Sequence, residues 1–254
     1  DFGENLKCVA RAGAGTNNIP IDEATKQGIV VFNTPGANAN AVKELVICGM
    51  LLSSRGIIEG IEFAKKLDLK DPKGLNKAME AQKKSFAGNE LDGKTLGIIG
   101  LGSIGSMLAQ AAQTLGMKLI GYDPYISIES AWRLPREVGK AETMDELLQH
   151  SDYVSLHVPL AEETTNLINK SNLNKFKKGA RLINLSRGGI VNTADVIEEL
   201  ETGNLGRFVT DFPTPELIKR SAEKNDVVLL PHLGASTKEA EINCAVMAAN
   251  QMVN

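Results

Sequence analysis

Residues 95–105 read Thr-Leu-Gly-Ile-Ile-Gly-Leu-Gly-Ser-Ile-Gly, and this stretch decides the fold. Its first five residues form a short, mostly apolar run, typical of a strand buried on both faces. The residues that follow place Ile104, Leu108 and Leu115 at helical spacing on one face. A strand that turns through glycines directly into an amphipathic helix indicates the start of a strand–helix–strand unit.

The glycines of this turn, Gly100, Gly102 and Gly105, match the requirements of a dinucleotide-binding turn. The first permits the tight turn, the second lets the backbone approach a pyrophosphate, and the third lets helix and strand pack closely. The helix N-terminus then offers N–H groups to the phosphates. By itself this pattern also fits a turn that merely needs glycine.

Asp123 strengthens the dinucleotide interpretation, because it follows the next expected strand, 18 residues after Gly105. A carboxylate at that place can bind both hydroxyls of the adenosine ribose, and it repels a 2′-phosphate. Its neighbours are Tyr122, Pro124 and Tyr125, without Arg or Lys. The sequence therefore favours NAD over NADP as cofactor.

Short apolar runs and helical patterns alternate along the rest of the chain. The expected strands are 95–99, 118–122, 153–158, 180–185, 207–210 and 227–230. The expected helices are 103–115, 144–149, 193–201 and one that begins near 236. Ser or Thr followed three residues later by Glu predicts capping boxes at Thr143 with Glu146 and at Ser236 with Glu239. This alternation predicts an α/β fold with a doubly wound parallel sheet.

The first 37 residues repeat the theme, with strands expected at 7–10 and 29–32 and a helix at 22–27. A long helix is expected from Ala39 to Arg55. Residues 59–89 are rich in Lys and Glu, and we interpret them as a solvated helical excursion, because such runs are usually exposed faces.

The composition is that of an ordinary globular chain, with 254 residues, 43% of them hydrophobic, and a net charge of −3. This charge gives no reason to expect nucleic acid or acidic membranes as partners. Nothing approaches the ~20 apolar residues that cross a bilayer, and no signal peptide is visible. Asp1 is not an initiator methionine and the chain stops in a helical pattern, so we expect both ends to be missing.

Cys8, Cys48 and Cys244 favour reduced, buried thiols in a cytoplasmic protein, without disulfide or metal site.

The three histidines differ in what their positions suggest. His150 ends an amphipathic helix, where a cation is favourable without any function. His157 and His232 each follow an apolar strand, where parallel sheets bind ligands, although a structural role explains His157 almost equally well. Arg187 ends another such strand, and Asp211 and Glu216 follow the strand 207–210.

These side chains suit the reduction of a 2-oxo acid. The guanidinium can hold a carboxylate with two hydrogen bonds, and the histidine can protonate the carbonyl oxygen. A nearby glutamate would keep that imidazole protonated near neutral pH. From spacing alone, a surface ion pair with a capping histidine is an equally good interpretation.

Taken together, these motifs resemble the D-isomer-specific 2-hydroxyacid dehydrogenases, in order and approximate spacing, over nearly the whole chain. The motifs are Gly100–Gly105 with Asp123, His157-Val158-Pro159, Asn184–Gly189, Asp211 with Glu216, and Pro231–Thr237. Within the family, residues 11–18, 33–38 and 232–240 are most similar to D-3-phosphoglycerate dehydrogenases.

The resemblance implies catalytic roles for Arg187, Glu216 and His232: Arg187 orients the substrate, His232 exchanges the proton and Glu216 is its partner. It implies a cofactor site made of Gly100, Gly102, Ser103, Ile104, Gly105, Asp123, His157, Val158, Pro159, Thr164, Leu185, Ser186, Arg187, Asp211, His232, Gly234 and Ala235. The substrate site would be Arg11, Gly13, Ala14, Gly15, Arg187 and His232.

The resemblance also implies the organisation of the chain. Residues 38–237 would form the NAD-binding Rossmann domain. Residues 1–37 and the helix 238–254 would belong to a partial, smaller, flavodoxin-like substrate domain, with substrate bound between the two. The helix 39–55 resembles the one through which relatives dimerise, so a homodimer or higher homo-oligomer is expected.

Four features depart from the family pattern. Leu217 follows Glu216, where the family has proline; Asn192 replaces a common aspartate; and the excursion 59–89 is longer than typical. The loop from Glu216 to His232 also looks shorter than usual.

The function that the resemblance favours is NAD-dependent oxidation of 3-phosphoglycerate to 3-phosphohydroxypyruvate, a step of serine biosynthesis. A glyoxylate or hydroxypyruvate reductase, or a D-lactate-type enzyme, is the alternative within the class. A non-enzymatic NAD sensor or corepressor is the alternative from another class, and it is disfavoured by the presence of Arg187, Glu216 and His232.

Overall fold

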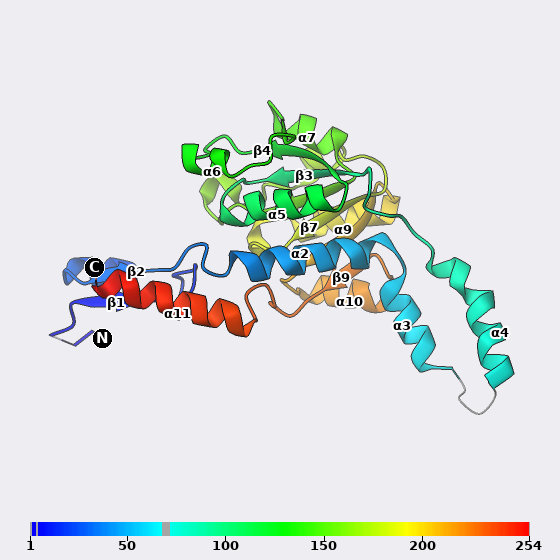
Figure 1. The fold of residues 1–254 in the computed structure, drawn as a ribbon, viewed down its shortest axis with the longest axis horizontal. Coiled ribbons are helices and arrows are strands. Elements are labelled where there is room, and N and C mark those ends of the chain that lie inside the picture. Colours follow the sequence, from blue (N-terminus) through cyan, green and yellow to red (C-terminus); the bar gives the residue numbers. More distant parts are fainter. Residues whose placement is uncertain (1, 4, 68–71, 254) are drawn as a thin grey trace. The chain divides into compact units, whose positions relative to one another are not determined.

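The computed structural model describes residues 2–3, 5–67 and 72–253, and its backbone divides into two compact units. One unit is formed by residues 1–45 and 232–254, and the other by residues 46–231. Figure 1 labels the helices and strands of each unit.

The smaller unit contains a two-stranded parallel sheet. Its elements are β1 (Cys8–Ala10), α1 (Ile21–Lys26), β2 (Val30–Phe32) and α11 (Lys238–Val253), with α2 (Ala39–Ser54) passing from this unit into the other. These agree with the expected elements to within one or two residues.

The larger unit is built on a seven-stranded sheet in the order β5-β4-β3-β6-β7-β8-β9, parallel throughout. The strands are β3 (Thr95–Ile99), β4 (Lys118–Tyr122), β5 (Gly139–Lys140), β6 (Tyr153–Leu156), β7 (Ala180–Asn184), β8 (Leu205–Thr210) and β9 (Val227–Leu229). The helices are α3 (Ile57–Lys65), α4 (Pro72–Gln82), η1 (Lys83–Phe86), α5 (Ser103–Thr114), α6 (Ile128–Trp132), α7 (Met144–His150), η2 (Glu162–Thr164), α8 (Lys170–Leu173), η3 (Gly188–Ile190), α9 (Thr193–Thr202) and α10 (Pro215–Glu223).

Helices cover both faces of this sheet, which confirms the doubly wound α/β fold. On one face, α5 lies against Ile98 and α2 against Val209, and a Cβ on Gly49 would come within 2.9 Å of that valine. On the other face α7 lies so close to β3 that a Cβ on Gly97 would overlap Ser151 (Figure 1).

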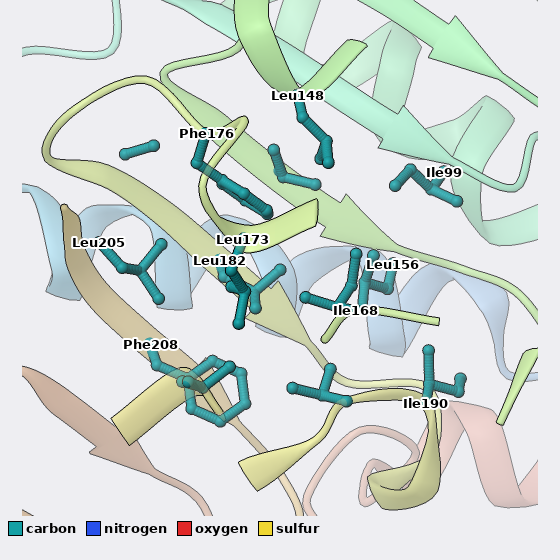
Figure 2. Close-up of a cluster of buried hydrophobic side chains, with 14 of the residues drawn as sticks. Ile99, Leu148, Leu156, Ile168, Leu173, Phe176, Leu182, Ile190, Leu205 and Phe208 are labelled. Atoms are coloured by element: carbon teal, nitrogen blue, oxygen red, sulfur yellow. The ribbon is translucent and has the colours of Figure 1, made fainter. Parts of the chain in front are cut away.

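The core of the larger unit lies on the α7 side of the sheet (Figure 2). Leu156, Leu182 and Phe208 of the central strands, each at most 2% exposed, meet Leu148 of α7 and Leu173 of α8 there. These strands are apolar on both faces, as a covered parallel sheet requires.

Several local expectations need correction. The last helix is capped by Thr237, whose Oγ1 accepts from the Ala240 N–H at 3.1 Å, and not by Ser236. At α7, Thr143 does accept from the Glu146 N–H, but Glu146 returns its bond to the N–H of Glu142. The expected loop from Glu216 to His232 begins within a helix, α10 (Pro215–Glu223). The strands expected to reach Val158 and Leu185 end at Leu156 and Asn184.

The cysteines are free, as expected, but only Cys244 is buried, whereas Cys8 is half-buried and Cys48 is exposed. The excursion 59–89 is helical and mostly exposed in its described part. Within the described residues, no helix is both long and apolar enough to span a membrane.

Candidate active site

The candidate site lies beside β3, where the strand order of the sheet reverses. The chain runs outward from β3 to β4 and β5, and then returns to β6 on the other side of β3. Ligands of doubly wound sheets bind at the carboxyl ends of the strands at such a point. The residues there are the turn Gly100–Gly105 after β3 and His157–Pro159 after β6.

The glycine turn has the geometry that its sequence predicts. Gly100 has φ +91°, and a Cβ on it would lie 2.6 Å from the carbonyl oxygen of His157. A Cβ on Gly105 would overlap the carbonyl oxygen of Gly100. A Cβ on Gly102 would meet nothing within 4 Å. Gly100 and Gly105 are thus required by the fold, whereas Gly102 faces open space.

The residues present fit the pyrophosphate of a dinucleotide. Gly102 is the N-cap of α5, it has no side chain to cap the helix, and both it and Ser103 are exposed. The first N–H groups of a helix have no partners within it, and they attract anions together with the helix dipole. Gly102, Ser103 and Ile104 therefore form an open helix N-terminus that can receive phosphate oxygens.

Asp123 lies beside this turn and is tied to it. Its Oδ2 accepts from the Leu101 N–H at 2.8 Å, and its Oδ1 accepts from the Tyr125 N–H at 2.9 Å. The carboxylate is half-buried and therefore has a fixed orientation. Each oxygen keeps lone-pair capacity for a further hydroxyl donor, as ribose binding requires.

His157 follows β6 with its imidazole turned into the protein. Nε2 lies 2.8 Å from Ser155 Oγ, and Nδ1 is buried without a hydrogen-bond partner among the described residues. Burial lowers the pKa of His157 to about 4, so the ring is neutral near pH 7. Its backbone, rather than its ring, borders Gly100. Nearby, Thr164 Oγ1 donates to the carbonyl oxygen of Pro159 at 2.6 Å and so closes the loop after Val158.

Arg187 is presented by a short loop after β7. Its side chain is exposed, and Nη1 donates to the carbonyl oxygen of Ser186 at 2.6 Å. Ser186 Oγ donates to the carbonyl oxygen of Leu156 at 2.5 Å, which fastens this loop to the end of β6. Leu185 is buried beneath the loop. Arg187 thus lies at a strand end two positions from β3 in the sheet.

Asp211 and Glu216 follow β8 but differ in their surroundings. Asp211 is 1% exposed. Glu216 is exposed at the start of α10, where its own N–H and the Thr214 hydroxyl lower the pKa of its carboxyl. Glu216 also lines a cavity of about 590 Å³ that reaches Asn184 and Gly188. The Thr-Pro-Glu sequence at 214–216 is an N-cap signal that could have predicted this helix.

Asn192, the departure from the family pattern, has a structural explanation. It is the N-cap of α9, and its Oδ1 accepts from the Asp195 N–H at 3.2 Å. Asparagine and aspartate serve this role equally well.

The remaining expected residues belong to the smaller unit. His232 is exposed and has φ +56°, a conformation that non-glycine residues rarely adopt and that occurs often at functional sites. It precedes Gly234 and Ala235 before α11.

The loop Arg11–Gly15 follows β1 in the same unit. The N–H of Thr34 donates to the Gly13 carbonyl oxygen at 3.0 Å, and Asn33 Nδ2 donates to that of Ala14 at 2.8 Å. Arg11 Nη1 donates to Asn17 Oδ1 at 3.4 Å. The Asn33-Thr34 segment thus holds the loop in place.

The described residues contain no group of three or more His, Cys, Asp or Glu side chains that could hold a metal ion. The fold and the glycine turn with Asp123 define a dinucleotide-binding α/β protein, with an exposed arginine after β7 of the same sheet. Residues 50–234 match the NAD-binding domain of the D-isomer specific 2-hydroxyacid dehydrogenases. The chain belongs to this family of NAD-dependent oxidoreductases, and NAD is the cofactor of its larger unit.

Two curated relatives illustrate the range of similarity. A D-3-phosphoglycerate dehydrogenase of Synechocystis is 39% identical over 98% of this chain and 43% of its own length. A hydroxypyruvate reductase of Thermotoga maritima is 40% identical over 95% of this chain and 74% of its own length. The chain spans less than half the length of the curated phosphoglycerate dehydrogenases it matches.

Solved structures agree with the fold. The D-mandelate dehydrogenase of Rhodotorula graminis superposes with a TM-score of 0.83 at 28% identity, over 98% of this chain and 71% of that one. The NAD⁺-bound 3-phosphoglycerate dehydrogenase of Entamoeba histolytica gives 0.75 at 31% identity, over 98% and 72%.

Proposed function

We propose that this chain carries out NAD-dependent oxidation of 3-phosphoglycerate to 3-phosphohydroxypyruvate, as a step of serine biosynthesis. The proposal is carried by one observation: the exposed Arg187 follows the carboxyl end of β7, and the open N-terminus of α5 follows the carboxyl end of β3 in the same parallel sheet. The choice of substrate is supported by the similarity to phosphoglycerate dehydrogenases of several organisms, at 37–39% identity.

In this proposal each charged side chain has one task. Arg187 pairs with the substrate carboxylate through two hydrogen bonds and so orients the hydroxyl-bearing carbon. His232 accepts the hydroxyl proton during oxidation and returns it during reduction. NAD, when bound, supplies the hydride acceptor. Glu216, whose lowered pKa keeps it ionised, stabilises the positive charge on the imidazole.

The proposed binding residues comprise the cofactor and substrate sets named from the sequence. Asp123 binds the ribose hydroxyls, Gly102 to Ile104 bind the pyrophosphate, and the loop Arg11–Gly15 binds the substrate. We further propose that residues 38–237 act as the NAD domain and that residues 1–37 with 238–254 act in substrate binding. The protein is proposed to be a cytoplasmic homodimer or higher homo-oligomer; the three free cysteines fit a reducing compartment.

A second candidate is reduction of hydroxypyruvate, because the chain covers 74% of the Thermotoga maritima relative named for that activity, against less than half of the phosphoglycerate dehydrogenases of Synechocystis, Bacillus subtilis and Rattus norvegicus. The two candidates share the site and differ only in the phosphate of the substrate.

The test is NADH oxidation by the protein with four 2-oxo acids: 3-phosphohydroxypyruvate, hydroxypyruvate, glyoxylate and pyruvate. The proposal predicts a kcat/KM at least about tenfold higher for the phosphorylated acid, since a paired phosphate contributes more than ~1.4 kcal/mol. Preference for hydroxypyruvate would select the second candidate. Tight NADH binding without turnover of any acid would favour an NAD sensor instead.

A further inference from the structure

Asn184 is a polar side chain where the fold alone would favour an apolar one. It is the last residue of β7, paired with Leu156 of β6 on one side and Thr210 of β8 on the other. It is 1% exposed, in a strand whose preceding residues are Leu182 and Ile183. Buried amides persist in such places where they are hydrogen-bonded.

The hydrogen bonds of this side chain go to the loop that presents Arg187. Asn184 Nδ2 donates to the carbonyl oxygen of Arg187 at 2.8 Å. Asn184 Oδ1 accepts from the Ser186 N–H at 3.2 Å. Both of the side-chain bonds observed within the described residues thus fix the backbone on either side of the Ser186–Arg187 peptide.

Arg187 depends on this support because its own side chain is exposed. Its guanidinium donates to the Ser186 carbonyl oxygen, which belongs to the peptide that Asn184 clamps. The starting point and direction of the side chain are set by that peptide. A displacement of about 1 Å in a group that orients substrate can cost on the order of a hundredfold in rate.

We propose that Asn184 is a positioning residue for Arg187: its buried amide holds the loop so that the guanidinium meets the substrate carboxylate. This inference rests on the proposed function, because it assumes that Arg187 binds the substrate.

The test compares Asn184→Leu with Asn172→Leu in the full chain. Asn172 is a matched control: it is 6% exposed, its Nδ2 donates to the Leu167 carbonyl oxygen at 2.7 Å, and its Oδ1 accepts from the Asn169 N–H at 3.1 Å. It lies in α8, and neither of its side-chain hydrogen bonds goes to the loop that presents Arg187. The measurements are KM and kcat for the 2-oxo acid, Kd for NADH, and Tm.

We expect both substitutions to lower Tm, but only Asn184→Leu to raise the KM for the 2-oxo acid, by at least about tenfold. The Kd for NADH should rise by a smaller factor than the KM, because α5 and Asp123, the proposed sites of the pyrophosphate and the ribose, are untouched. If Asn184→Leu does not fold, Asn184→Ser replaces it, since a serine cannot reach the Arg187 carbonyl oxygen. An unchanged KM in the folded variant would overturn the inference.

A double-mutant cycle with Arg187→Gln separates the two proposals. If Asn184 acts through Arg187, the fold-changes in KM will be non-additive, and Asn184→Leu will add less than about twofold in the Arg187→Gln background. Full additivity would overturn the role of Asn184 alone. If Arg187→Gln leaves the KM unchanged, it is the proposed function of Arg187 that fails.

Discussion

His157 is kept neutral by its surroundings, and this makes folding sensitive to acid. In the unfolded chain its pKa is near the ordinary 6.5, whereas burial lowers it to about 4 in the fold. Between those two values the unfolded chain binds a proton that the folded protein does not. The contribution of the neutral ring is complete above pH 6.5 and is lost as the pH falls to 4.

The variant His157→Gln should therefore lose less stability on acidification. We expect its free energy of unfolding to fall by about 2 kcal/mol less than that of the wild type from pH 7 to pH 4, less than the full pKa shift implies because the residue as a whole is only half-buried. Urea unfolding at several pH values measures this difference. His150→Gln is the control, because His150 is exposed at the end of α7. Parallel curves for wild type and His157→Gln would refute the explanation.

His232, although it belongs to the proposed cofactor-binding set, is expected to contribute mainly to proton transfer and little to the affinity for the cofactor. His232→Gln should lower kcat by about 10²- to 10⁴-fold, which is the usual contribution of a positioned acid or base. The Kd for NADH, followed by fluorescence, should stay within about threefold. His150→Gln again serves as the control and should change neither quantity. Equal loss of binding and turnover in His232→Gln would mean that the residue is structural.

For single residues, the sequence identifies the side chains that can carry out chemistry, but it does not identify their hydrogen-bond partners. The positions of Arg187 and Asp123 at strand ends were predictable, because apolar runs mark the strands. The Asn184 amide and the bond from Leu101 N–H to Asp123 could not be predicted, since they depend on the geometry of loops that residue types alone do not encode.

The glycine turn lets cofactor binding be separated from folding within one element. Gly102→Ala places its Cβ in open space, so Tm should change by no more than about 2 °C. The same methyl group lies at the N-terminus of α5 and should weaken NADH binding at least about tenfold.

Gly105→Ala is the matched comparison, because its Cβ would overlap the Gly100 carbonyl oxygen. We expect it to lower the free energy of unfolding by about 2 kcal/mol or more. Differential scanning calorimetry and NADH titration of both variants check the pair. If Gly102→Ala bound NADH normally, the turn would not be the pyrophosphate site.

Helix α10, which begins beside Glu216, is fastened through Arg220. Arg220 is 6% exposed; its Nε and Nη2 donate to the two carboxylate oxygens of Asp226 at 3.0 and 2.6 Å, and Nη1 also pairs with Glu201 of α9. The hydrogen bonds to Asp226 raise the pKa of Arg220 despite its burial. The pair thus joins α10 to the start of β9.

Arg220→Met should cost about 3 kcal/mol of stability, because it leaves Asp226 without its buried partner. The exposed neighbour Lys219 gives the control Lys219→Met, expected to change stability by no more than about 0.5 kcal/mol. Urea unfolding of the two variants measures this difference in stability. Similar stability of both would show that the ion pair contributes little.

For whole elements, periodicity was a good guide where helices and strands are long. The strands β3, β4 and β7 were predicted to within a residue because their apolar runs are continuous. Helices α6, α8 and α10 were not predicted, because they are short or follow proline-containing segments whose polar residues lack a clear helical period. The cap at Thr237 was missed by one residue, since Ser236 and Thr237 are equally good N-caps.

For the whole molecule, the alternation of strands and helices was enough to predict the parallel sheet with helices on both faces. The strand order follows from the right-handed crossover rule together with a reversal beside β3. The boundary between residues 45 and 46 could not be predicted from the sequence. It lies inside α2, whose helical pattern continues across it without a break. Oligomeric state and substrate depend on surfaces and contacts that local sequence patterns do not specify.

The central claim is that this chain supports hydride transfer with D-2-hydroxy acids. The most direct measurement is the initial rate of NADH formation from NAD with the D and L forms of one 2-hydroxy acid in parallel. We predict formation of NADH with the D form and a rate at least about a hundredfold lower with the L form, because a carboxylate held by Arg187 would present only one face of the neighbouring carbon to the cofactor. Equal rates, or no NADH from either form by a protein that binds NADH, would contradict the claim.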